Sequence, residues 1–375
     1  MALVDVYSPE MWAQETLAQL MKKSVMIGLV HRDFSSEIAQ QGDTVNTRMP
    51  GTLTADDVNL SALAAETPTA TNVAVTLDTW KYVRFAIDDK TASLSMKDLV
   101  TEFMEPAAIA LRDKVEASLM GLIADIGQYV GTAGDPPDSV TDFAEIKKAM
   151  DSFYIRSDGR VCVLSPAAEL DYHTVFYAAN TLGDGGRELR TGELGQKFGI
   201  SFFGSTEIPS LATAGTNDGA GLIDNGAGYA AGTTTIHVDG LGNAKTVVAG
   251  SCLSIGGYYY AVTTGGTSSA DAEGEMDIVI SPGLYAAVSD GDAVTLLTGA
   301  HVKNVAFVRD AFALVSRPLA APKAPGANVA VVNYGGLGLR SAVWYEAKDK
   351  KTYVDLDLLY GVKTLDPRKA VRVLG

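Results

Sequence analysis

The sequence predicts a mixed α+β fold that contains an extended β-hairpin, a long helix and an inserted antiparallel β-barrel. Three observations predict it. Hydrophobic residues alternate with period two on both sides of a polar stretch within residues 41–85. An apolar stripe with helical spacing then runs from Lys97 to Gln128. Between Gly232 and Gly299, short strand-like runs follow one another with turn residues between them.

The first predicted element is a helix that begins at Ser8. Ser8 can accept a hydrogen bond from the first turn, Pro9 suits the first helical position, and Glu10 complements the helix dipole. Apolar residues recur with helical spacing as far as Met26. A polar break at His31 separates this helix from the hairpin.

The hairpin is predicted from alternation that runs from Thr44 to Met49 and resumes from Val73 to Ile87. Limbs of about 12 residues would reach roughly 40 Å at the rise of a strand. A projection of that length is hard to bury against its own domain, so we expect it to contact a surface elsewhere.

The long helix is predicted after Ser95, which forms a capping box with Asp98. Its apolar stripe continues to Gln128. Pro106 lies inside this span and must kink or restart the helix, because proline cannot donate the backbone hydrogen bond.

A mixed α/β unit follows a glycine- and proline-rich break. We expect a helix over Thr141–Phe153, a buried strand over Arg160–Ser165, a helix from Pro166 to Ala179 and a strand over Gly199–Gly204. The α/β pattern then stops, so the next segment marks an insertion.

The inserted segment, residues 231–300, reads as a small antiparallel barrel. Residues 205–300 hold 17 of the chain's 38 glycines. Its short apolar runs predict strands: Thr233–Val238, Ser251–Ile255, Tyr258–Thr263, Met276–Ile280 and Ala293–Leu297. The α/β pattern resumes at Ala306–Val308 and Phe312–Ser316.

The C-terminal residues predict returning strands. Leu339–Val343 and Tyr353–Leu359 flank a basic turn, and Val371 and Val373 follow a Pro-containing break.

Charge and cysteine content limit the classes of function that the chain can have. The 30 basic and 45 acidic residues give a formal net charge of −15 without a cluster of Lys and Arg, which excludes tight direct binding to DNA. Cys162 and Cys252 each lie in an apolar run, as buried free thiols do. We expect no signal peptide, and no apolar run approaches the roughly 18 residues of a membrane span.

The search for catalytic, cofactor or metal motifs finds none. The four histidines are scattered: His31, His173, His237 and His301. No pair has the spacing of zinc ligands, and no nucleophile or phosphate-binding motif is present. We therefore expect no catalytic residue, no cofactor, no metal site and no enzymatic activity.

The order of elements resembles that of the tailed-bacteriophage major capsid (coat) protein family, which has the Hong Kong ninety-seven fold. Three segments carry the resemblance: Thr191–Ile200, Asn304–Leu314 and the ending Tyr360–Pro367. The insertion is similar to the accessory β-barrel of podovirus-type coat proteins. The resemblance covers nearly the whole chain.

This resemblance implies five parts. They are an N-terminal arm (1–40), an extended loop (41–85), a peripheral domain with the spine helix (86–134 and 335–375), an axial domain (135–230 and 301–334) and the inserted barrel (231–300). Trp12, Met49, Trp80 and Phe85 are the apolar residues that we expect the arm and loop to place against neighbouring subunits.

The implied function is a shell subunit that forms hexamers and pentamers around phage double-stranded DNA, in a virion head assembled in the host cytoplasm. Its partners would be copies of itself, a scaffolding protein, a portal protein and decoration proteins, with no membrane. Some family members cross-link through a loop lysine, and no lysine lies between Lys23 and Lys81 here. Two alternatives stay open: an encapsulin-type nanocompartment shell, and a carbohydrate-binding or adhesive β protein.

Overall fold

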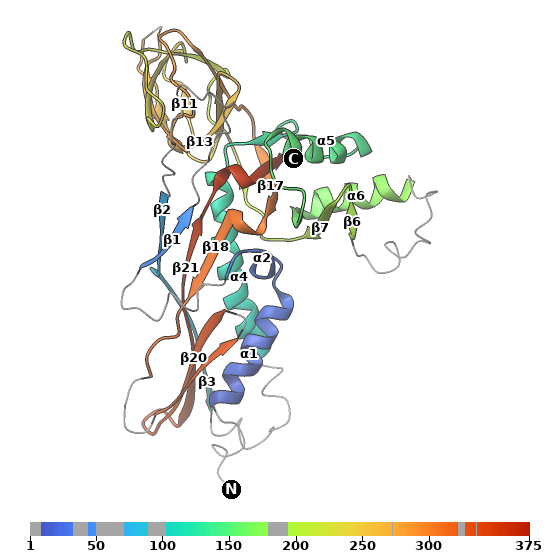
Figure 1. Cartoon of the computed structure of the whole chain (residues 1–375). Coiled ribbons are helices and arrows are strands. Elements are labelled where there is room, and N and C mark those ends of the chain that lie inside the picture. The colour runs from blue at the N-terminus through green and yellow to red at the C-terminus, as the bar shows by residue number, and fades with distance from the viewer. Residues whose placement is uncertain are drawn as a thin grey trace, which may run out of the picture. The chain divides into compact units, whose positions relative to one another are not determined.

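The computed structural model describes residues 9–32, 44–49, 71–88, 103–178, 194–271, 273–321, 327–334 and 336–375 (Figure 1). The chain divides into two compact units. The first comprises Met1–Ser24, His31–Lys114 and Ala313–Leu365, and the second comprises Val25–Val30, Val115–Phe312 and Asp366–Gly375. The mixed α+β architecture with an inserted barrel, predicted from the sequence, is confirmed.

The first unit is built on a five-stranded sheet. Its strands are β3 (Thr79–Asp88), β18 (Phe312–Ser316), β19 (Ala327–Tyr334), β20 (Leu337–Glu346) and β21 (Lys351–Thr364). β21 pairs antiparallel with both β20 and β3, and β19 pairs antiparallel with β20. Helix α1 (Pro9–Lys23) lies along β19 and β20 and buries Leu17 and Leu20 (Figure 1).

The hairpin is confirmed within the described residues. β1 (Thr44–Met49) and β2 (Thr71–Thr76) pair antiparallel over six residues each. β3, predicted to continue the second limb, instead pairs with β21 over ten residues. Between these strands, Leu77 is buried in one cluster with Val45 and Val75. The predicted tip, residues 50–70, lies outside the described residues.

The long helix is confirmed within the described residues, and it ends earlier than predicted. α4 runs over Glu105–Gly121 and continues as the 3₁₀-helix η3 over Leu122–Asp125, three residues short of the predicted end. Pro106 is the second residue of α4, and Phe103 and Met104 directly before α4 have π-helical backbone. Ser95 and Asp98 lie outside the described residues.

The second unit contains a mixed sheet of seven strands. They are β4 (Tyr129–Val130), β5 (Arg160–Leu164), β6 (Gln196–Lys197), β7 (Ile200–Gly204), β8 (Ser210–Leu211), β17 (His301–Val308) and β22 (Ala370–Leu374). Helices α5 (Val140–Ser152) and α6 (Pro166–Ala178) pack on it around Phe143 and Tyr172. Ser139 and Asp142 form the capping box of α5.

The inserted barrel is closed by six strands in the order β10–β15–β13–β12–β16–β9 (Figure 1). They are β9 (Ala220–Ile223), β10 (Thr235–Asp239), β12 (Cys252–Ile255), β13 (Tyr258–Thr264), β15 (Met276–Ser281) and β16 (Ala293–Leu296). β9 precedes the predicted start of the insertion. Its buried positions are Gly221, where a Cβ would meet Val238 Cγ1 at 2.7 Å, and Ile223. Leu222 between them is exposed, so no clear apolar alternation marks this strand in the sequence.

The remaining short elements are α2 (Met26–Leu29), β11 (Thr246–Val247), β14 (Gly266–Thr267), η5 (Arg309–Ala311) and η6 (Pro367–Lys369). β11 and β14 form a separate two-stranded sheet. Cys162 and Cys252 are buried free thiols, as predicted. Within the described residues, every helix is too short or too polar to cross a membrane.

Candidate functional site

The outward surface of β3 carries exposed aromatic side chains. Because successive side chains of a strand point to opposite faces, Trp80, Tyr82 and Arg84 share one face. The same face continues at Ala86, whose register partner on β21 is Tyr353, and Tyr353 in turn pairs with Trp344 on β20. Trp80 is 56% exposed and Tyr82 is 62% exposed. We call the five residues other than Ala86 the β3 outer face.

Two ion pairs fix the β3 outer face. Arg84 donates from Nε and from one terminal nitrogen to both carboxylate oxygens of Asp355, at 2.5 and 2.6 Å. Arg340 donates from Nε and from one terminal nitrogen to a single carboxylate oxygen, Asp357 Oδ2, at 3.0 and 2.7 Å. Trp80 Nε1 also donates to Asp357 Oδ1, at 3.0 Å. The hydrogen bond to Asp355 raises the pKa of the Arg84 guanidinium.

The aromatic rings of this face are ordered by stacking. Trp344 and Tyr353 stack with ring centroids 5.5 Å apart. The Arg84 guanidinium carbon lies 5.2 Å from the Trp344 ring centroid and 5.9 Å from that of Tyr82. Exposed Trp and Tyr with a fixed Arg are the residues that dominate protein–protein contacts. The arrangement suits binding of another protein surface.

The structure separates the four predicted contact residues. Trp80 lies on the β3 outer face, whereas Phe85 points to the inner face and stacks on Phe103 with centroids 5.6 Å apart. Trp12 lies in α1 and Met49 ends β1, and their side chains are outside what the structure describes. Sequence reasoning missed Tyr82, although its position two residues after Trp80 places it on the same face.

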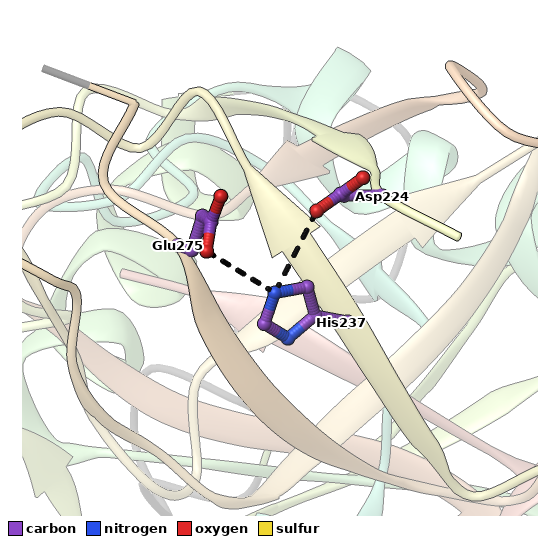
Figure 2. A group of neighbouring side chains, drawn as sticks. All are labelled: Asp224, His237 and Glu275. Atoms are coloured by element: carbon purple, nitrogen blue, oxygen red, sulfur yellow. Dashed lines mark ion pairs between the residues drawn. The ribbon is translucent and has the colours of Figure 1, made fainter. Parts of the chain in front are cut away.

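A second group of functional side chains lies on the barrel, where Asp224, His237 and Glu275 come together (Figure 2). His237 lies in β10, Asp224 directly follows β9 and Glu275 directly precedes β15. His237 Nε2 is 3.7 Å from both Asp224 Oδ2 and Glu275 Oε2. On the other side of the ring, Nδ1 is 2.7 Å from Asp277 Oδ1. This hydrogen bond raises the pKa of His237.

Spacing along the chain gives no sign of this group, because its members are brought together by pairing of neighbouring strands. β10 pairs with β9 on one side and with β15 on the other, and His237 is the register partner of Asp277. One ligand atom from each of Asp224, His237 and Glu275 lies within 4.8 Å of the others. These three residues could hold a metal ion.

Buried cations support both the sheet and the barrel of the second unit. Arg372 in β22 is fully buried and donates to four backbone carbonyls, those of Gly250, Ile123, Ala124 and Ile126. Three of these carbonyls belong to the end of η3, where helical hydrogen bonding runs out. The Arg372 side chain therefore caps the long helix and binds it to the barrel.

Lys303 is another buried cation, and its charge is unfavourable. It is 6% exposed, and burial together with the Arg372 charge lowers its pKa to about 8. Lys303→Met is expected to stabilise the fold at pH 7 by about 2 kcal/mol, because it removes a desolvated charge. The unfolded chain keeps its proton up to about pH 10.5, so the cost of Lys303 disappears between pH 8 and 10.5.

Urea denaturation of the unaltered chain and of Lys303→Met across this pH range measures the free energy of unfolding of each protein. The difference between the two free energies is expected to be constant below pH 8 and to fall toward zero as the pH rises to 10.5. A difference that grows as the pH rises would contradict the conclusion that the buried charge of Lys303 destabilises the fold.

The comparisons identify related proteins. Residues 275–375 match the family described as P22 coat protein - gene protein 5. No curated protein matches the sequence. A solved structure from Mycobacterium phage Che8 is similar with a TM-score of 0.53 and 16% identity, covering 94% of this chain and 91% of that chain.

Two further structures are similar at lower TM-scores. One is the capsid of the cyanophage P-SCSP1u, with a TM-score of 0.47 and 10% identity, covering 89% of this chain and 84% of that chain. The other is the mature capsid of bacteriophage PhiM1, with a TM-score of 0.45 and 12% identity, covering 89% and 82%. The coat-protein family match over residues 275–375 and the fold shared with the Che8 structure confirm the resemblance to the tailed-phage major capsid proteins.

Proposed function

We propose that this chain builds a closed icosahedral shell of hexamers and pentamers that encloses phage double-stranded DNA, and that it acts by self-association and not by catalysis. The observation that carries the proposal is the P22 coat protein match over residues 275–375. The matched segment includes β20 and β21, which supply Trp344 and Tyr353 to the β3 outer face. This face is suited to a second copy of the chain.

Each part of the chain would have a separate role in assembly. The N-terminal arm (1–40) and the extended loop (41–85) would contact neighbouring subunits. The peripheral domain (86–134 and 335–375) and the axial domain (135–230 and 301–334) would form the shell wall, with the barrel (231–300) as an accessory domain. The net charge of −15 supports a wall that contains DNA without binding it tightly. Assembly would take place in the host cytoplasm, with scaffolding, portal and decoration proteins as partners.

Shell subunits are expected to hold together without covalent cross-links. No lysine lies between Lys23 and Lys81, so the tip of the extended loop lacks the amine that such a link requires. Purified particles boiled in denaturant are expected to run on a gel as one band at the mass of the single chain, 39.4 kDa. A ladder of bands at multiples of that mass would contradict this expectation.

Sedimentation velocity of the purified chain tests self-association. The protein is expected to sediment as large assemblies in equilibrium with a small amount of free subunit. Sedimentation as a single small species at every concentration would overturn the proposal.

A further inference from the structure

We propose that Asp224, His237 and Glu275 form a binding site for a divalent cation of the zinc class on the outside of the inserted barrel. The proposal goes beyond shell assembly. It assigns a metal ligand to the outside of the inserted barrel, and self-association of the chain does not require a ligand there. It rests on three observations: the rigid frame that carries the ligands, the hydrogen bond that orients the histidine, and the spacing of the donor atoms (Figure 2).

The frame is three adjacent strands of a closed barrel. β9, β10 and β15 are hydrogen-bonded neighbours, so the backbone positions of the three ligands are fixed relative to one another. The Asp224 amide donates to the His237 carbonyl at 3.1 Å. The His237 amide donates to the Tyr229 hydroxyl at 3.0 Å. Ligands held on strands need little reorganisation to bind a metal.

Asp277 orients the imidazole in the manner of a metal-binding histidine. Such histidines usually donate the ring N–H that faces away from the metal to a carboxylate. Here His237 Nδ1 lies 2.7 Å from Asp277 Oδ1. A proton on Nδ1 leaves the lone pair of Nε2 directed toward Asp224 and Glu275. Three carboxylates therefore surround one imidazole, and a divalent cation would balance their charge.

The spacing of donor atoms favours a small ion with mixed ligands. Nε2 is 3.7 Å from each carboxylate oxygen, whereas two ligands on a tetrahedral zinc ion stand about 3.3 Å apart. The Asp224 and Glu275 side chains are 45% and 41% exposed, so small rotations can close this difference. One imidazole nitrogen with two carboxylates suits Zn²⁺, whereas Mg²⁺ and Ca²⁺ prefer oxygen ligands alone. Water would complete the coordination.

Titration calorimetry with ZnSO₄ on the full-length chain tests the proposal. We expect saturable binding of one Zn²⁺ per chain, with Mg²⁺ binding at least about tenfold more weakly. His237→Asn and Asp224→Asn are expected to reduce the affinity for Zn²⁺ at least about tenfold, and Asp277→Asn by about 10- to 100-fold. The matched control is Asp218→Asn, which removes an exposed barrel carboxylate paired with Lys245 outside the cluster. This control is expected to bind Zn²⁺ like the unaltered chain.

Thermal unfolding gives a second readout. A ligand that binds only the folded state raises the melting temperature as its concentration rises. Added Zn²⁺ is expected to raise the melting temperature of the unaltered chain and of Asp218→Asn, and to leave that of His237→Asn unchanged. Equal Zn²⁺ affinity in the unaltered chain and His237→Asn would overturn the proposal, as would the absence of saturable binding. Either result would leave His237 as an ion-pair partner of the surrounding carboxylates alone.

Discussion

Arg372→Met is expected to lower the free energy of unfolding by about 4 kcal/mol, the largest effect of any single substitution proposed for this chain. The substitution removes four hydrogen bonds and leaves the carbonyls of Ile123, Ala124, Ile126 and Gly250 without their buried donor. Methionine replaces the volume of the side chain but supplies no N–H group. Urea denaturation of the purified subunit measures the loss.

Arg156→Met is the matched control. Arg156 belongs to the same unit and pairs with Asp310 at 3.2 Å, but its side chain is 54% exposed. The same chemical change is expected to cost less than about 1 kcal/mol there. Equal losses in the two variants would show that Arg372 does not cap the long helix.

The double substitution Trp80→Ala with Tyr82→Ala is expected to reduce the yield of assembled particles at least about tenfold. Aromatic side chains at the centre of an interface contribute about 2 kcal/mol or more each, and every subunit of a shell repeats the contact. The subunit itself is expected to fold, since Asp357 keeps its ion pair with Arg340. Sucrose-gradient sedimentation of assembly reactions measures the yield.

The control for this substitution is Tyr154→Ala, which removes a fully exposed tyrosine from outside the β3 outer face. Its particle yield is expected to match that of the unaltered chain. Particle yields that are equal in the double variant and in the unaltered chain would show that the β3 outer face takes no part in assembly. Circular dichroism of each variant separates an assembly defect from a folding defect.

Local patterns in the sequence predicted the elements, but pairing between distant segments could not be predicted. Period two identifies Lys81–Ile87 as a strand, yet its partner β21 lies about 270 positions later, as the Arg84–Asp355 pair shows. The sequence offers a nearer partner in Thr44–Met49, which is why Lys81–Ile87 was predicted to continue the hairpin. The barrel strand β9 was missed for a different reason, since one of its two inward residues is a glycine and the residue between them is an exposed leucine.

Candidate functional residues could be predicted where a local pattern marks them, but not where pairing of distant strands brings them together. Trp80 was expected to contact a neighbouring subunit because it is a large apolar residue in an alternating strand, and the structure shows it exposed. The cluster around His237 depends on the register of three strands, which spacing along the chain does not encode. Arg372 stands in the run Ala370–Leu374, where a single arginine in a short strand gives no sign of burial.

Cryo-electron microscopy of the purified chain tests the central claim most directly. We expect closed icosahedral particles whose wall resolves into hexamers and pentamers of this one chain, with the β3 outer face buried between subunits. A protein that stays monomeric, or that forms only open or irregular aggregates, would contradict the proposal that the chain is a self-assembling shell subunit.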